Sequence, residues 1–320
     1  MRAYLVRRLL LIIPTLFLVT VIAFCAVRFI PGSVIDLMVA EMAAESTMPT
    51  ELTAEHIRHE LGMDVPIYVQ YARWAVKAVQ GDLGRSIWYH HSVTQEVLRG
   101  LPVTLELGLL ALTTAVLIAI PIGVYSAVRQ DTLGDYSSRT FAILLISLPP
   151  FWVGTLIMVY PSIWWGWSPP VQLIPFVDDP LANLSQFLLP AVIQGMAMSG
   201  TTMRMTRTMM LEVLRQDYIR TAWAKGLRER TIVIRHATKN ALIPVISHVG
   251  TQIGIVLSLT VVIEQIFCLP GIGFTLMEAL NKRDYPMITG INLFIAGFVL
   301  ISNLAVDISY AYLDPRVHYR

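Results

Sequence analysis

The chain has 320 residues, of which 55% are hydrophobic and 14% are charged, and its formal net charge is +2. A soluble domain carries about 25% charged residues, so a soluble fold of this length could not cover so much apolar surface. The nearly neutral charge gives no sign of a nucleic-acid-binding protein. The two cysteines, Cys25 and Cys268, form no CxxC motif and are too few for a disulfide framework. The composition therefore indicates an integral membrane protein.

Six apolar segments are long enough to cross a bilayer, because a hydrocarbon core of about 30 Å needs about 20 helical residues. They cover residues 9–30, 101–128, 140–164, 184–203, 243–267 and 288–313. The first follows basic residues, as a cleaved signal peptide would, but its apolar stretch is longer than that of a signal and lacks a small-x-small cleavage site. We therefore expect a retained anchor and an all-α integral membrane protein with six transmembrane helices.

Basic residues are distributed unevenly between the segments that join these spans. If the N-terminus is cytoplasmic, the inner segments 1–8, 129–139, 204–242 and 314–320 hold 16 Lys and Arg, and the outer loops 31–100, 165–183 and 268–287 hold 7. The positive-inside rule then places both termini in the cytoplasm. The expected organisation is an N-terminus with the first span (1–30), an extracytoplasmic cap loop (31–100), a transmembrane core (101–313) containing a cytoplasmic loop (204–242), and a cytoplasmic tail (314–320).

The outer loop 31–100 carries the pattern of two short amphipathic helices. Ala54, Ile57 and Leu61 share one helical face before Gly62, and a second apolar face runs from 67 to 78 between Pro66 and Gly81. The sequence thus predicts a small cap on the outer membrane surface, which serves either as a packing lid or also as a contact for a delivering partner.

The inner loop 204–242 has nine basic and three acidic residues and contains a short predicted helix. Asp217 suits an N-cap, residues 218–225 make two turns, and Gly226 ends them. So short a helix needs a surface to dock on. Tyr218 and Trp223 are apolar anchors, and the small Ala222 and Ala224 would let a partner approach closely. The competing interpretation is a solvated basic loop that only sets topology.

The segment 217–227 resembles the cytoplasmic EAA loop of ABC importer permeases, and more narrowly that of the dipeptide, oligopeptide and nickel permease family. Counting back from Gly226 places Arg220 and Thr221 where the broad pattern has Glu and Ala, and only Ala222 matches. Pro244 also lies farther from Gly226 than in the broad pattern. Both departures are usual in the peptide branch and therefore favour it.

Several separate blocks resemble the same family along nearly the whole chain. They are GDLGRS at 81–86, LPVTLEL at 101–107, PGIG at 270–273, RDYP at 283–286, Asn303-Leu304, Asp307 and DPR at 314–316. The sequence PGSV at 31–34 departs from the PGDP that the family often has.

The resemblance implies a type I importer permease-like fold in a bacterial inner membrane. The chain would be the permease subunit of an ATP-driven importer, with di- or oligopeptides as the expected cargo and nickel or another small solute as the alternative within the family. It would work by alternating access with a second, different permease, two ATPase subunits and an extracytoplasmic substrate-binding protein. The resemblance assigns ATPase coupling to Asp217, Tyr218, Arg220, Thr221, Ala222, Ala224, Lys225 and Gly226.

The chain itself is expected to be no enzyme and to need no cofactor or metal. The dipeptide Gly-Lys never occurs, so a P-loop is excluded, and ATP with Mg²⁺ would be bound by the partner ATPase chains. Nickel ligation by His56 and His59 or by His90 and His91 is an alternative to solvated loop histidines.

Polar residues inside the spans are the remaining candidates. Glu106, Glu264 and Asp307 could hydrogen-bond neighbouring helices or line the transport pathway. Ser199 and His248 suggest an intramembrane serine protease, but position 197 is Ala where that motif has Gly, so helix packing is the favoured interpretation.

Overall fold

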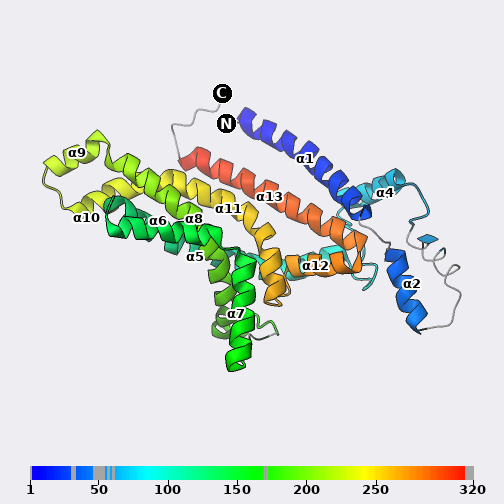
Figure 1. Cartoon of the computed structure of the whole chain (residues 1–320). Coiled ribbons are helices and arrows are strands. Elements are labelled where there is room, and N and C mark those ends of the chain that lie inside the picture. Colours follow the sequence, from blue (N-terminus) through cyan, green and yellow to red (C-terminus); the bar gives the residue numbers. More distant parts are fainter. Residues whose placement is uncertain are drawn as a thin grey trace. The chain divides into compact units, whose positions relative to one another are not determined.

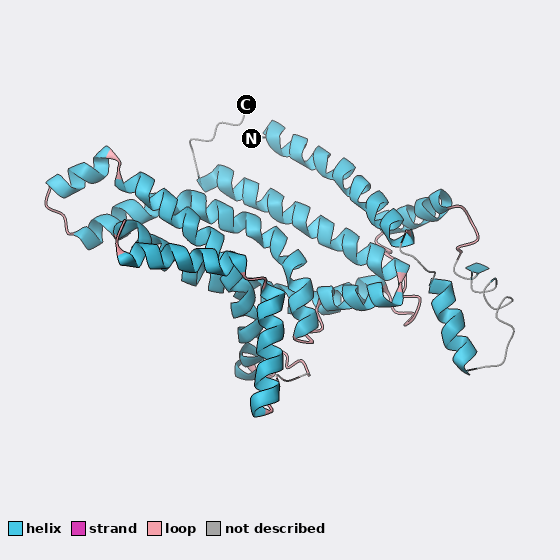
Figure 2. Ribbon diagram, viewed as in Figure 1, coloured by secondary structure: helices cyan, strands magenta, loops and turns pink. Residues whose placement is uncertain are grey.

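The computed structural model describes residues 2–29, 34–45, 55, 58–59, 62–168, 170 and 172–313 (Figure 1). Regular structure in these residues is helical throughout, apart from an isolated antiparallel bridge between Arg85 and Ser92 (Figure 2). The all-α prediction is therefore confirmed for the described part of the chain. The chain divides into two units, one from 1–102 with 270–300 and one from 103–269 with 301–320.

The first unit contains α1 (Arg2–Arg28), α2 (Val34–Glu45), α4 (Ile67–Val79), the start of α5 (Val93–Val128), α12 (Ile272–Lys282) and the start of α13 (Tyr285–Leu313). Its largest buried cluster joins α5 to α12 and α13 through Val93, Val97, Ile272 and Ile288. The predicted cap helix over 67–78 is confirmed as α4, which packs on α1 with the Phe24 and Tyr71 ring centroids 5.3 Å apart. Ala54, Ile57 and Leu61, which carry the pattern of the first predicted cap helix, lie outside the described residues.

The second unit contains the rest of α5, α6 (Leu133–Ser147), α7 (Pro150–Trp165), α8 (Pro180–Leu214), α9 (Asp217–Ala224), α10 (Glu229–Thr231), the π-helix η1 (Ile232–Thr238), α11 (Lys239–Ile266) and the end of α13. Helix α8 contacts α6, α7 and α11. It also lies close to α5, because a Cβ added to Gly123 would be 2.8 Å from the carbonyl oxygen of Met203. Among the described residues, the two largest buried clusters of this unit lie around Leu107, Phe187 and Ile263 and around Met210 and Ile232.

In the part of the chain that the structure describes, five helices are long and apolar enough to cross a membrane, and a bent pair brings the number to six if it counts as one span. The five are Leu10–Arg28, Val93–Val128, Pro180–Leu214, Glu229–Ile266 and Tyr285–Val306. They correspond to five of the six predicted spans, and several extend beyond the predicted ends.

The predicted third span over 140–164 is present as an apolar segment but is not one continuous helix. The segment is broken between α6 and α7, whose axes differ by 84°. Leu148 and Pro149 have extended backbone, with ψ of 117° and 128°. Proline donates no backbone hydrogen bond and disfavours helical geometry in the residue before it, so Pro149 and Pro150 together interrupt the helix that the apolar composition alone suggests.

Candidate functional site

The short helix α9 packs one face against its own chain at the end of the α8–α11 hairpin (Figure 1). Ile219 is fully buried and Ala222 is 8% exposed, and both belong to the cluster that contains Met210 of α8 and Ile232 of η1. These two residues are three apart and therefore lie on one side of the helix. Tertiary packing thus supplies the stability that eight residues lack on their own.

A left-handed glycine ends α9, as the sequence predicts. Gly226 has a φ of +73°, and its N–H donates to the Trp223 carbonyl at 2.9 Å. The N–H of Leu227 donates to the Ala222 carbonyl at 3.4 Å, which completes a Schellman motif. The backbone geometry at 226 therefore requires a residue that tolerates positive φ.

The N-terminal prediction for this helix is corrected by the structure. Gln216 occupies the N-cap position with extended backbone and makes no side-chain cap, and Asp217 is the first helical residue. The carboxylate of Asp217 instead accepts an exposed hydrogen bond from Arg220 at 3.4 Å, and its charge suits the positive end of the helix dipole.

The exposed face of α9 carries aromatic and basic side chains. Tyr218 is 45% and Trp223 is 47% exposed. Arg220, Thr221, Ala224, Lys225 and Gly226 are exposed beside them, and the Thr221 hydroxyl donates to the Asp217 carbonyl at 3.0 Å. Tyr218 is held by Asn240 of α11, whose side-chain amide donates to the tyrosine oxygen at 2.9 Å.

Ala222 does not lie on this exposed face, contrary to the expectation that a partner surface approaches it. A small residue is needed at 222 because the side chain faces the buried cluster of the same chain. Ala224 is the small residue of α9 that remains exposed. The alternation of small and large residues in this helix did not reveal which alanine faces inward.

The polypeptide after Gly226 returns to the bundle through a π-helix that the sequence pattern did not predict. Residues 232–238 have π-helical hydrogen bonding, and the Thr238 hydroxyl donates to the Val233 carbonyl five residues earlier at 2.9 Å. Ile232 and Ala237 are buried against α8 and α9 in the same cluster as Ile219. A π-helical segment has more residues per turn than an α-helix, so its side chains point in different directions from those an α-helix would give. Such segments are frequent at functional sites.

Two acidic residues of the spans in the second unit lie beside polar side chains of neighbouring helices. Glu264 is fully buried and accepts a hydrogen bond from Thr104 at 2.7 Å, which joins α11 to α5. Glu106 is half-buried and lies near the side chain of Asn183 of α8. Glu264 thus joins two helices of this chain, and a pathway-lining role of Glu106 and Glu264 stays a prediction. The side chain of Asp307 lies outside the described part of the structure.

Ser199 and His248, the candidates for protease chemistry, each hydrogen-bond within their own helix. The Ser199 hydroxyl donates to the Met196 carbonyl at 2.6 Å, and His248 pairs with the side chain of Gln252. Of the candidate nickel ligands, His90 and His91 line two different pockets, so their side chains do not converge on one site. His56 lies outside the described residues. Within the described residues, no group of three His, Cys, Asp or Glu side chains is arranged to hold a metal.

The sequence matches known proteins along almost its whole length. The family of binding-protein-dependent transport system inner membrane components matches residues 119–319, and its N-terminal companion matches residues 1–108. The di/tripeptide transport system permease protein DppB of Pseudomonas aeruginosa is 36% identical over 340 residues, and the dipeptide transport system permease protein DppB of Escherichia coli is 34% identical over 343. These alignments cover 100% of this chain and 100% of each relative.

Structural likeness adds less than these sequence matches. A chain from the crystal structure of an amino acid ABC transporter aligns over 70% of this chain and 95% of its own length, at 13% identity and a TM-score of 0.49. A likeness of this size is too low to assign fold or function, so the assignment rests on the family matches and the full-length relatives. The chain belongs to the family of binding-protein-dependent transport system inner membrane components, the permeases of ABC importers, and is a multi-pass membrane protein.

Proposed function

We propose that this chain is the permease subunit of an ATP-driven importer of di- or oligopeptides and that α9 couples it to a separate ATPase subunit. The observation that carries the coupling role is the exposed face of α9, with Tyr218 and Trp223 about half exposed beside Arg220 and Lys225. Aromatic and arginine side chains of this kind dominate the binding energy of protein interfaces. The peptide cargo is supported by the names of the relatives from Pseudomonas aeruginosa and Escherichia coli.

Helices α8 and α11 are long enough to connect α9 directly to the membrane-spanning part of the chain, so a movement of α9 can be transmitted to the spans. Helix α8 has 35 residues, and α10, η1 and α11 together span 38. At a rise of 1.5 Å per residue, α8 is about 52 Å long, so about 20 Å extends beyond a hydrocarbon core of about 30 Å. Because Ile219 and Ala222 are packed between these helices, a displacement of α9 moves α8 and η1 with it.

The proposed cycle needs separate chains for its energy and its cargo. ATP and Mg²⁺ would be bound by two ATPase subunits, and their closure on ATP would pull the α9 helices of two different permeases together. The permeases would then change from an inward-facing to an outward-facing pathway. An extracytoplasmic substrate-binding protein would deliver the cargo, and the exposed Tyr68, Val76 and Val79 of α4 offer it an apolar contact.

Substitution of Trp223 by Ala tests the coupling surface. We expect the ATPase subunits to bind about 2 kcal/mol more weakly, roughly 30-fold in Kd, because an exposed aromatic anchor is removed without disturbing the buried face. Trp167→Ala is the matched control, since Trp167 is 43% exposed and lies in the loop after α7. ATPase subunits that co-purify equally with both variants would refute a docking role for α9.

The cargo requires a separate experiment, because similarity to peptide permeases does not by itself identify what this chain transports. Uptake of a labelled dipeptide by vesicles that contain the complete importer should be competed by unlabelled di- and tripeptides. Uptake of nickel or another small solute, unaffected by peptides, would favour the alternative within the family and leave the coupling role intact.

A further inference from the structure

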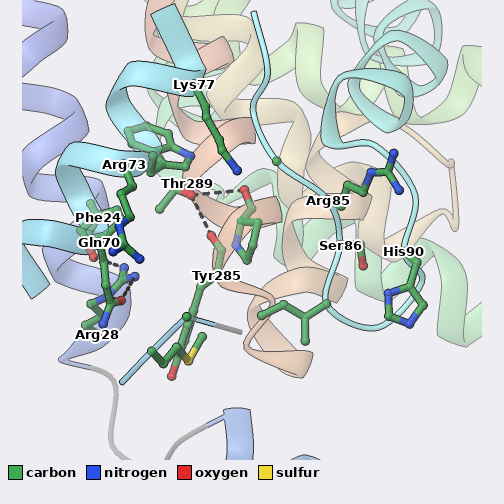
Figure 3. A pocket seen from close by; sticks show the side chains of 16 residues that line it. Phe24, Arg28, Gln70, Arg73, Lys77, Arg85, Ser86, His90, Tyr285 and Thr289 are labelled. Carbon is green, nitrogen blue, oxygen red and sulfur yellow. Dashed lines mark hydrogen bonds between the residues drawn. The ribbon is translucent and has the colours of Figure 1, made fainter. Parts of the chain in front are cut away.

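We propose that a basic pocket in the first unit binds the phosphate of an anionic phospholipid headgroup at the membrane boundary. The pocket has a volume of about 470 Å³ and lies between the end of α1, helix α4, the loop 84–90 and the start of α13 (Figure 3). A volume of this size is in the range of small-molecule sites.

Four side chains that are positively charged at neutral pH line the pocket, namely Arg28, Arg73, Lys77 and Arg85, and no acidic residue stands among its described lining residues (Figure 3). Arg28 is held in place by the Gln70 amide oxygen, to which its Nη2 donates at 2.7 Å, and by the Phe24 ring, 3.5 Å from its guanidinium carbon. Both of these partners are neutral. The positive charge of the pocket is thus not neutralised by the described residues that line it, and an anion would be attracted.

A buried hydrogen-bond donor in the pocket wall also lacks an acceptor. The Nε1 of Trp74 is buried and has no partner in the described residues, although Trp74 lines the pocket. A buried donor without an acceptor destabilises a fold. The oxygen of a bound phosphate group is an acceptor of the required kind.

The position of the pocket favours a lipid over a soluble anion. Arg28 is the last residue of the candidate span Leu10–Arg28, and Tyr285 is the first residue of the candidate span Tyr285–Val306. Both residues line the pocket, so two spans end at it. Aromatic and basic side chains at the ends of spans lie at the depth of lipid headgroups.

The surface of α1 offers a path for the acyl chains of the same lipid. Phe17, Leu18 and Ile22 are all more than half exposed along the span that leads to Arg28, and Phe29 is 83% exposed just beyond it. A phospholipid could therefore place its chains along α1 and its phosphate among the four basic side chains. A free phosphate has no apolar part and would gain nothing from this surface.

Binding can be measured by native mass spectrometry of the full-length chain in detergent, titrated with dioleoyl phosphatidylglycerol or with dioleoyl phosphatidylcholine. We expect the anionic lipid to bind more tightly, and Arg73→Gln with Lys77→Gln to weaken it by about fivefold for each charge removed. Arg99→Gln is the matched control, because Arg99 lines a different hollow of the same unit that also contains Glu96 and Glu278. Arg85→Gln is a second pocket variant with an exposed side chain, and thermal melting of every variant verifies folding.

Competitors separate the sources of the anion. Millimolar glycerol phosphate should fail to displace the lipid, and a tripeptide should also fail. Equal binding of the two lipids, an equal loss in the Arg99→Gln control, or displacement by either soluble competitor would overturn the proposal. The readout is lipid binding, so failure of the proposed transport function would not affect it.

Discussion

The guanidinium of Arg207 on α8 makes two hydrogen bonds to the carboxylate of Asp135 on α6, Nε to Oδ1 at 2.8 Å and Nη2 to Oδ2 at 2.7 Å. The carboxylate is fully buried and also accepts from the Ser126 hydroxyl at 2.5 Å and the Asp131 N–H at 3.1 Å. The pair therefore joins α8, the helix that leads to α9, to the turn between α5 and α6. It lies in the part of α8 that extends toward the proposed coupling surface.

Removal of the arginine from this pair should destabilise the second unit. Arg207→Ala leaves a buried carboxylate without its charged partner, and breaking a buried ion pair in this way costs about 3–5 kcal/mol. We expect a lower melting temperature and a lower yield of the purified chain. Arg204→Ala on the same helix is the control, because the Arg204 side chain is exposed to solvent. Equal melting temperatures for the two variants would show that the pair adds little.

A graded series at Gly226 tests the termination of α9. Asn tolerates left-handed geometry, Ala raises its energy by roughly 1–2 kcal/mol, and Pro is incompatible with a φ of +73° and removes the N–H that bonds to Trp223. Transport in vesicles and co-purification of the ATPase subunits should therefore fall in the order Asn, Ala, Pro. Membrane insertion should not change, because the spans lie elsewhere. Normal transport by Gly226→Pro would contradict the coupling role of 217–226.

Replacement of Ala222 or Ala224 in α9 by the much larger Trp should have different effects on folding and on ATPase binding. Ala222→Trp places a large side chain in a buried cluster, and overpacking of this kind typically costs about 1–3 kcal/mol, so the folded yield should fall. Ala224→Trp lies on the exposed side, so the chain should fold normally and lose affinity for the ATPase subunits. Thermal melting and co-purification measure the two effects. If Ala224→Trp keeps full ATPase binding, the partner does not contact this side of α9.

The bent pair α6–α7 decides the number of crossings and hence the position of the C-terminus. A reporter that is active only outside the cytoplasm should be silent after Asp131 and after Leu227, and active after Asp82 and after Gly166. This pattern follows if α6 and α7 together cross the membrane once, with both termini inside. Silence after Gly166 would indicate a re-entrant pair and place the two termini on opposite sides.

Local properties of the sequence determined much of this protein. Apolar segments of about 20 residues indicated the spans, because a bilayer of fixed thickness requires an apolar helix of this length. Both ends of α9 could be predicted to within one residue. The C-terminal end was marked by Gly226, because glycine adopts positive φ without strain and so commonly ends a helix. Pro149 and Pro150 carry a signal for the break in the third span, and the apolar composition of 140–164 on which the prediction rests does not contain it.

Only the tertiary structure decided how distant segments meet. The blocks at 81–86 and 283–286 are joined where the Ser86 hydroxyl donates to the buried Asp284 carboxylate at 2.5 Å, across 198 residues of sequence. Asp135 and Arg207 are 72 residues apart, and no local pattern pairs them. The side of α9 on which Ala222 lies also depended on Met210 and Ile232, which come from neighbouring helices. Hydrogen bonds and side-chain packing act over a few ångströms in space whatever the separation along the chain, so these contacts exist only once the helices have packed.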